Sequence, residues 1–539
     1  MKAVRLMMRW LMPASLSMLA IINGCASQAR DLFEPDWDRV LAEEEATRET
    51  IPVDAPARPP GELPLNVPDL VGDGPLSLTI EQAALLALDM NRELQVAQLT
   101  PEIAGAFEMI ELGVFDPEVF ANVDFATEEV QETARTTGEQ FGVRGDERRY
   151  EVGVRQTLPS GTGIEVGLTQ DRTASSRSPE QQSARFGMTI TQSLLRGFGP
   201  VVNLALVRQA ELETVASRFE LRRFIEVLLA ETEVAYWNYV LARREIEIFE
   251  RSLAVAQTQA EQVRERISVG VLSEAESAAP ESEVALREQA LIEARSSVEA
   301  TRLELLRRIN ALGIVPPDRA LIPLSPPDIE PEPIIDVEDR LEVARRYRPD
   351  VNEARVRFDQ NRLETVRTRN GLLPRLDVFI ALGKSGYGDT FEQTFREIDE
   401  NGFDASIGLA ASQSIERLAA RGAHRVAIAT RQQSAAAIRN LEQLIELDVL
   451  LAVNEVERAR QQIEASATTR RLQARTAEAE GQRFEAGTST AILVAQAQRD
   501  LLQAEIAEVE SILAYRIALI ELYLAEGTLL ERRGIVVPD

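Results

Sequence analysis

Apolar residues occupy every second position in four short segments of the chain. They are residues 118–125 (EVFANVDF), 185–192 (RFGMTITQ), 375–383 (RLDVFIALG) and 402–412 (GFDASIGLAAS). A period of two is that of a β-strand, and about 9–11 residues is the length that a tilted strand needs to cross a membrane. The pattern therefore predicts about four membrane strands. Because the signal of each strand is weak, two soluble hairpins are the alternative.

A further period-two pattern occupies residues 150–170 (YEVGVRQTLPSGTGIEVGLTQ). Apolar residues alternate on both sides of PSGTG, whose Pro and Gly residues favour a turn. A β-hairpin is expected here. The pattern does not distinguish a hairpin within the membrane sheet from one that projects beyond it.

Long helical segments follow each pair of strands. Residues 201–268 and 423–480 contain neither Gly nor Pro, and at 1.5 Å per residue the first would form a rod of about 100 Å if unbroken. Antiparallel partner helices are expected at 271–312 and 488–526. Pro280 predicts that the first partner begins afresh or bends there.

Residues 225–256 carry apolar residues with a seven-residue repeat. Two of the three repeating sets merge into one stripe, whereas the third lies more than about 100° away around the helix. The third set is Val227, Val234, Leu241, Ile248 and Val255. A two-stranded coiled coil needs one seam. Two seams predict a neighbouring helix on each side, as in a sheet of helices closed into a tube, and a helix buried in an ordinary bundle is the alternative.

The two halves of the chain align at a constant offset. The helical segments that begin at Leu78 and at Val337 have the same character, and three matched pairs lie 257 positions apart. The pairs are Leu94 with Val351, Ala97 with Ala354 and Pro117 with Pro374. Since the same order of elements follows each proline, we infer an internal duplication.

Each pair of long helices is joined by a turn around one glycine. The turns RISVGVLS (266–273) and RFEAGTST (483–490) place Gly270 and Gly487 217 positions apart. Both have Arg four positions before the glycine and a hydroxyl residue three positions after it. Glycine supplies the left-handed conformation that ends one helix and lets the next begin.

The amino-acid composition disfavours catalysis, metal binding and nucleic-acid binding. A net charge of −28 disfavours nucleic acid as a partner. One His and one Cys leave little for a metal site or a nucleophile, and no phosphate-binding loop is present. The many carboxylates lie among helical heptads, where a solvated face is the usual reason for them. We therefore expect no enzyme activity, no cofactor and no metal.

Residues 1–24 have the features of a secretory signal peptide: a basic start, a short apolar run and a processing site. Ile22-Asn23-Gly24-Cys25 resembles a bacterial lipobox, although Asn23 is unusual there, and Cys25 would then carry the lipid. Ala26 after the cysteine points to the outer membrane. An incidental cysteine is the alternative. The Pro-rich residues that follow predict an extended tether.

Four strands cannot close a barrel wide enough to enclose anything, and open strand edges in lipid leave backbone groups without partners. The second seam of the helices also lacks a partner within one chain. A ring of identical copies would satisfy both, and its product is a hollow cylinder that is part strand and part helix.

The chain resembles the TolC-like outer-membrane efflux family. The similarity rests on LSLTIEQAALLALDMNRELQVAQ, ITQSLLRGFG (190–199), AYWNYVLARREIEI (235–248) and the segment 483–529, and it extends over about residues 78–530. It implies a mixed α/β membrane protein: a homotrimer whose twelve-stranded barrel, about four strands per protomer, continues into a long periplasmic α-helical barrel.

The resemblance also assigns roles to the turns. It implies that a periplasmic adaptor, itself bound to an inner-membrane pump, docks on Val269, Gly270, Val271, Ala486, Gly487 and Thr488. Some family members carry acidic residues six and nine positions after the second glycine, where they narrow the tunnel. Here those positions hold Leu493 and Gln496, while Glu274 and Glu276 follow the first glycine. The aperture is expected among these four residues: a ring of carboxylates would have to come from the first hairpin, and an apolar ring at Leu493 is the alternative.

We therefore expect an outer-membrane channel of a tripartite efflux system in a Gram-negative bacterium. A type I protein-secretion channel and a lipid-anchored periplasmic coiled-coil scaffold are the alternatives. The expected organisation is a signal peptide, a lipidated tether, repeat 1, an equatorial linker, repeat 2 and a tail, in residues 1–24, 25–76, 77–313, 314–336, 337–527 and 528–539.

Overall fold

The computed structural model describes residues 74–133, 135–309, 315–316, 318–327, 330–398 and 402–535. The chain divides into two units, residues 1–63 and 64–539, and the described ranges belong to the second. Cys25, the expected signal peptide and the tether as far as residue 73 lie outside the described residues. Within these ranges, no helix combines the length and the apolar composition that a bilayer crossing requires.

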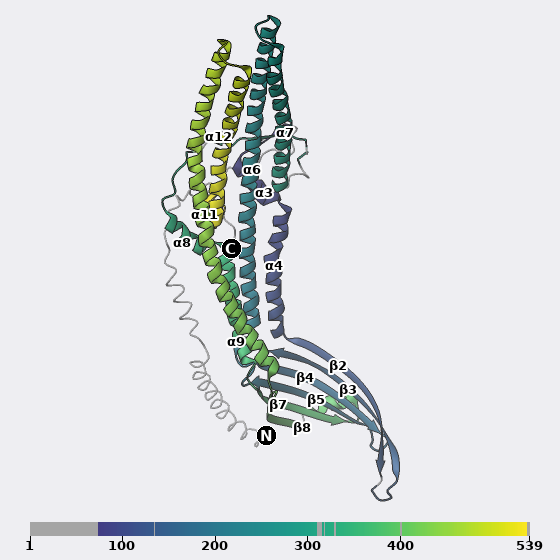
Figure 1. Ribbon diagram of the computed structural model, residues 1–539. Coiled ribbons are helices and arrows are strands. Elements are labelled where there is room, and N and C mark those ends of the chain that lie inside the picture. The colour runs from purple at the N-terminus through teal and green to yellow at the C-terminus, as the bar shows by residue number, and fades with distance from the viewer. Residues whose placement is uncertain are drawn as a thin grey trace. The chain divides into compact units, whose positions relative to one another are not determined.

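Two helical hairpins dominate the structure (Figure 1). Their helices are α6 (Ala205–Ser268) with α7 (Ala278–Ile309), and α11 (Leu418–Glu485) with α12 (Ala491–Glu526). The four long helices expected from the Gly- and Pro-free segments are therefore confirmed.

The helix ends differ in detail from the expectation. The short helix α5 (Pro200–Asn203) is separated from α6 at Leu204, and α11 runs through both Gly422 and Gly481. Pro280 lies in the first turn of α7, where its missing N–H would have no partner within the helix. The partner helix therefore begins afresh near this proline.

The duplication is visible in the element boundaries. Helices α3 (Ile80–Met90) and α8 (Val337–Tyr347) are offset by 257 positions at both ends, and α4 (Arg92–Leu112) and α9 (Pro349–Asn370) begin 257 positions apart. The first strand of the large sheet in each half also begins at this offset, at Glu118 and at Arg375. The predicted internal duplication is confirmed.

The helices form a row four helices wide at two levels (Figure 1). At the level nearer the sheet the order is α4, α6, α9 and α11; towards the hairpin turns it is α7, α6, α12 and α11. Side-chain hydrogen bonds join neighbours in the row, such as Gln209 to the Gln360 carbonyl at 3.0 Å and Asn361 to Ser434 at 2.8 Å. α6 has a neighbour on each side, as its two seams predicted.

One antiparallel sheet contains six strands. Their order is β2 (Glu118–Thr133), β3 (Gln140–Thr157), β4 (Thr162–Ser175), β5 (Gln181–Ser193), β7 (Arg375–Gly388) and β8 (Gly402–Ser412). The expectation of about four strands per chain is too low. Residues 150–170 pair between β2 and β5 as β3 and β4, because their apolar positions fall in register with those of the neighbouring strands.

The two faces of the sheet differ in polarity. Val119, Val123 and Phe125 of β2 share one exposed face, which continues through residues such as Val154, Phe186, Leu382, Ile407 and Leu409. The other face carries ion pairs across strands, including Arg155 with Glu118 and Arg149 with Asp171, both at 2.7 Å. This alternation suits a sheet with lipid on one side and water on the other.

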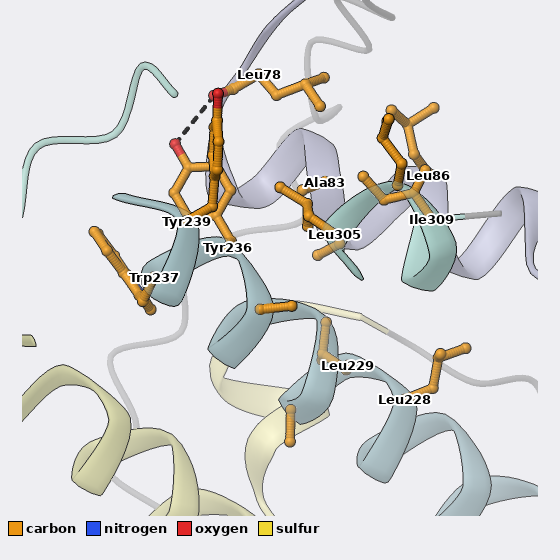
Figure 2. Packing of buried hydrophobic residues seen from close by; sticks show 14 of the residues in the cluster. Leu78, Ala83, Leu86, Leu228, Leu229, Tyr236, Trp237, Tyr239, Leu305 and Ile309 are labelled. Atoms are coloured by element: carbon orange, nitrogen blue, oxygen red, sulfur yellow. Dashed lines mark hydrogen bonds between the residues drawn. The ribbon is translucent and has the colours of Figure 1, made fainter. Parts of the chain in front are cut away.

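The main hydrophobic core joins the beginning of the described chain to the middle of α6. Figure 2 shows Leu228 and Leu229 of α6 beside Leu305 of α7 and residues of α3. Tyr236 donates a hydrogen bond to the Leu78 carbonyl at 3.0 Å, and Tyr239 donates one to the Leu321 carbonyl at 2.6 Å. These carbonyls belong to the short parallel strands β1 (Leu76–Leu78) and β6 (Leu321–Pro323).

The segment after α12 closes this core. Leu529 and Leu530 of α13 (Leu529–Arg532) are buried in it. Arg533 forms two hydrogen bonds to the buried carboxylate of Glu233, at 2.6 and 2.7 Å. Because an unpaired buried carboxylate is costly, this pairing fixes the end of the described chain against α6.

Glu226 is a buried carboxylate in the same region, with 2% of its surface exposed. Burial raises its pKa to about 7, against a lowering influence of Arg222 and a raising influence of Glu531 and Asp350. A carboxylic acid with a raised folded-state pKa favours the fold below its unfolded pKa, and this contribution is lost as the pH rises through 7.

We expect Glu226→Gln to raise the free energy of unfolding by about 1–3 kcal/mol at pH 8, because the charged form no longer has to be buried. At pH 4.5 the gain should vanish. Thermal denaturation of the purified protein at both pH values checks this, with Glu247→Gln as the control because Glu247 is exposed on the same helix. Equal effects of the two substitutions would contradict the buried-charge explanation.

Candidate functional site

The turns of the two hairpins have the same backbone geometry. Gly270 has φ +78° and Gly487 has φ +75°, a region that glycine adopts without steric cost. Each helix ends in a Schellman motif. Val271 and Thr488 donate to the carbonyls of Arg266 and Arg483, both at 2.8 Å. The predicted glycine turns are confirmed as structural elements.

The two tips pack against each other within one chain. Val263, Phe484, Ala491 and Val494 form a small core that also contacts Ile267. Phe484 is 5% exposed although it lies three residues from the end of the hairpin. The tips are therefore one packed unit.

Arg266 fastens this unit. Its guanidinium donates a hydrogen bond to the Phe484 carbonyl at 3.0 Å and lies 4.7 Å from the centre of the Phe484 ring. The same carbonyl accepts from Gly487 N–H at 3.1 Å. A cation over an aromatic ring contributes about 0.5–1 kcal/mol or more, in addition to the hydrogen bond to a charged donor.

Arg483 occupies the equivalent position in the second tip but has a different partner. It binds Glu480 at 2.5 Å on its own helix, and Ser489 donates to the same carboxylate at 2.7 Å. Ile267 stands in the first tip where Phe484 stands in the second. The duplicated turns thus share their backbone but differ in their side-chain contacts.

The residues expected to dock an adaptor are on the outside of the tips. Val269 is 68% exposed and Val271 is 69% exposed, and Ala486, Gly487 and Thr488 are exposed as well. Exposed apolar side chains at a helical turn are available to a partner. Their role in docking stays a prediction.

The residues expected at the aperture lie on different elements. Glu274 and Glu276 begin the short 3-10 helix η2 (Glu274–Ser277), whereas Leu493 and Gln496 are exposed one helical turn apart on α12. The structure therefore places Leu493 and Gln496 on one face, and their gating role stays a prediction.

A charged group further along the hairpins was not identified from the sequence. The carboxylate of Glu283 binds Arg287 at 2.6 Å on α7 and Arg499 at 2.8 Å on α12. Glu283 is 3% exposed, and burial lowers the pKa of Arg287. The i, i+4 spacing of Glu283 and Arg287 was a visible signal, but the third partner depends on the packing of α7 near α12.

Nothing in this arrangement resembles a metal centre. In the part of the chain that the structure describes, no three His, Cys, Asp or Glu side chains are placed to hold a metal ion. The tips offer exposed apolar surface and a hydrogen-bonded junction between two hairpins, which suits recognition and movement.

Comparison with known proteins gives the class. The family described as outer membrane efflux protein matches residues 162–311 and 341–528, more than half of the chain and both repeats. The chain therefore belongs to the outer membrane efflux protein family. No curated protein matches the sequence.

Solved structures of outer-membrane proteins share the fold. The Campylobacter jejuni CmeC outer membrane channel has 15% identity and a TM-score of 0.60, with 84% of this chain and 86% of that chain covered. The open Neisseria gonorrhoeae MtrE outer membrane channel has 19% identity and a TM-score of 0.61, covering 84% and 90%. The outer membrane protein VceC of Vibrio cholerae has 16% identity and a TM-score of 0.60, covering 83% and 96%.

We expect Arg266→Ala to loosen the junction between the tips, because it removes both the carbonyl hydrogen bond and the contact with the ring. Amide hydrogens of residues 484–494 should exchange about tenfold faster, which corresponds to about 1.4 kcal/mol. Hydrogen-exchange mass spectrometry measures this. Arg483→Ala is the matched control, and an equal effect of that substitution would show that the difference between the tips is unimportant.

Proposed function

We propose that the chain is the outer-membrane channel of a tripartite efflux system and passively conducts substrates that an inner-membrane pump drives. A periplasmic adaptor would dock on the exposed tips. The observation that carries the proposal is that the row of helices and the sheet are both open at both sides. Each chain is thus one segment of a wall, which identical copies would complete.

The outer side of α4 carries an unpartnered apolar stripe. Val96, Leu99, Ile103, Phe107 and Ile110 are each more than half exposed. At 100° per residue they fall within about 80° of one another. Of the buried residues of this helix, Leu94 lies on the opposite side and Ala104 about 100° from the centre of the stripe. α4 therefore has one face for α6 and another for a neighbour.

α11, at the other end of the row, also has one buried face and one exposed apolar face. Leu444, Leu447 and Leu451 of α11 are about half exposed, whereas Ile445 and Val449 are fully buried on the opposite side. Residues 424–448 of α11 lie at the level of α9, to which they bond through groups such as Glu442 and Arg355. An exposed apolar stripe thus lies on each flank of the row.

The sheet is open on the same two sides. α4 leads into the edge strand β2, and the other edge strand β8 leads into α11. One neighbour could therefore cover a helical flank and a strand edge together. Three copies, as the family resemblance implies, would close both levels, and Cys25 would add a lipid anchor.

The two alternative functions, a type I secretion channel and a periplasmic scaffold, make different structural demands. A type I secretion channel has the same architecture, and the driving pump and its cargo distinguish the two. A periplasmic scaffold requires small soluble β domains, which does not fit one six-stranded sheet with an exposed apolar face. The channel accounts for that face.

Conductance across a planar lipid bilayer, measured together with the oligomer mass of the purified protein, tests the proposal. We expect discrete channel openings from a species of three chains. A stable, non-conducting single chain that stays in solution after removal of the lipid would refute it.

We expect Phe107→Glu or Leu447→Glu to shift the protein from trimer towards single chains, because each places a charge in an apolar interface. The dissociated fraction should rise at least about tenfold, as native mass spectrometry would show, with unchanged circular dichroism since both residues are exposed in one chain. Met109→Glu is the control: Met109 is 74% exposed but lies off the stripe. Equal dissociation in this control would contradict the interface.

We expect Leu493→Asp to increase block of the channel by divalent cations, because three copies would place three carboxylates at the entrance. Single-channel recording with and without the cation measures the block. Ile492→Asp, on the neighbouring exposed position, is the control. Unchanged recordings for Leu493→Asp would remove this residue from the aperture.

A further inference from the structure

We propose that three copies close an eighteen-stranded barrel in which β8 of one copy pairs with β2 of the next. The barrel is then as wide as the ring of helices, in contrast to the twelve strands that the family resemblance implies. This inference rests on the proposed function, because it needs the closed assembly. The observations that carry it concern the hairpin of β3 and β4, which adds two strands to each copy.

The hairpin begins at the same level as the other strands. β2, β5, β7 and β8 all connect to helices at this end of the sheet. The turn of residues 158–161 lies at this end too and is bound to the loop before α6. Ser193 N–H donates to the Gly161 carbonyl and Gly199 N–H to the Ser160 carbonyl, both at 3.1 Å.

Asn203 strengthens this attachment. Its side-chain amide donates at 2.9 Å both to the Pro159 carbonyl in the turn and to the Gly197 carbonyl in the loop. A Cβ atom on Gly161 would lie 2.1 Å from the Gly197 oxygen, so only glycine permits the contact. Residues 193–203 thus hold the added hairpin at the base of the sheet.

The apolar face continues through the hairpin without a break. Residues paired from strand to strand form rows that cross all six strands. Successive rows on the same face are two residues apart along each strand. The first row is Val119, Val154, Val166, Met188, Leu382 and Ala405. A hairpin that projected into water would not need apolar residues in these rows.

The opposite face is equally continuous. Gly153, Gly167, Gly187 and Gly383 are paired in four successive strands. Neighbouring side chains cover this row: an atom of the Phe120 ring is 2.7 Å from the place that a Cβ on Gly153 would occupy. This contact ties β3 to β2. Further along the same row, Arg185 of β5 lies against Gly187 and Gly383 and binds Asp404 at 2.7 Å, which joins β5, β7 and β8.

Simple geometry decides which barrel fits the helices. Three rows of four helices, spaced about 9.5 Å apart, have a circumference of about 114 Å. Eighteen strands spaced about 4.8 Å apart and tilted about 40° span about 113 Å, whereas twelve span about 75 Å. With eighteen strands the conduit passes from sheet to helices without narrowing, and selection by size is left to the tips.

Cysteine pairs on the lipid-facing side test the strand order in the assembled protein. Ala121 pairs with Val152, and Phe186 is three strands away from Ala121 in the same row. We expect the pair Ala121→Cys with Val152→Cys to form a disulfide in outer-membrane vesicles. The matched pair Ala121→Cys with Phe186→Cys should form none. In a twelve-stranded barrel β2 would lie beside β5, so a disulfide in the second pair would overturn the inference.

The wild-type protein provides a second test that needs no substitution. Electron-microscopy averages viewed along the channel axis should show a barrel backbone about 36 Å across, and a value of about 24 Å would overturn the inference. Failure of the proposed function is distinguishable, because the protein would then neither conduct nor form a trimer. A conducting trimer with the narrow barrel would remove the eighteen strands and leave the channel.

Discussion

The requirement that every backbone group in a lipid environment finds a hydrogen-bond partner dominates this molecule. One chain builds six strands that satisfy one another but leaves the outer edges of β2 and β8 unpaired. The helices are also incomplete within one chain, because α4 and α11 expose apolar stripes of side chains on the two flanks of their row. Because the open edges and the open flanks lie on the same two sides, one association between copies of the chain would satisfy both.

Internal duplication explains how a single chain supplies a segment of both the sheet and the row of helices. The two halves have since diverged in structure. The helices before the sheet keep an offset of 257 positions, and both hairpin turns keep the same backbone motif. The first half, however, contains four strands of the sheet and the second half two. At the tips Arg266 contacts the ring of Phe484, whereas Arg483 binds Glu480 on its own helix, and the first tip has Ile267 in place of the phenylalanine.

The sequence predicted what depends on local periodicity and failed where distant segments meet. The long helices, the repeat and the glycine turns were all visible, since each is written in a continuous stretch. The place of residues 150–170 was not, because it depends on Asn203 and Gly197 in another motif. The contact between Arg266 and Phe484 joins two tips that lie far apart in the sequence, so no local pattern predicts it. The burial of Glu226 is not predicted either, because its position among helical heptads is also typical of a solvated carboxylate.

The core around α6 has a consequence for biogenesis. It unites Leu76 and Leu78, the middle of α6, and Leu529 and Leu530, so its components are synthesised far apart in time. Because synthesis starts at the amino end, this core cannot be complete until residue 530 has been made, after both hairpins and all six strands of the sheet. The last residues to be synthesised therefore decide when the α-helical part is closed.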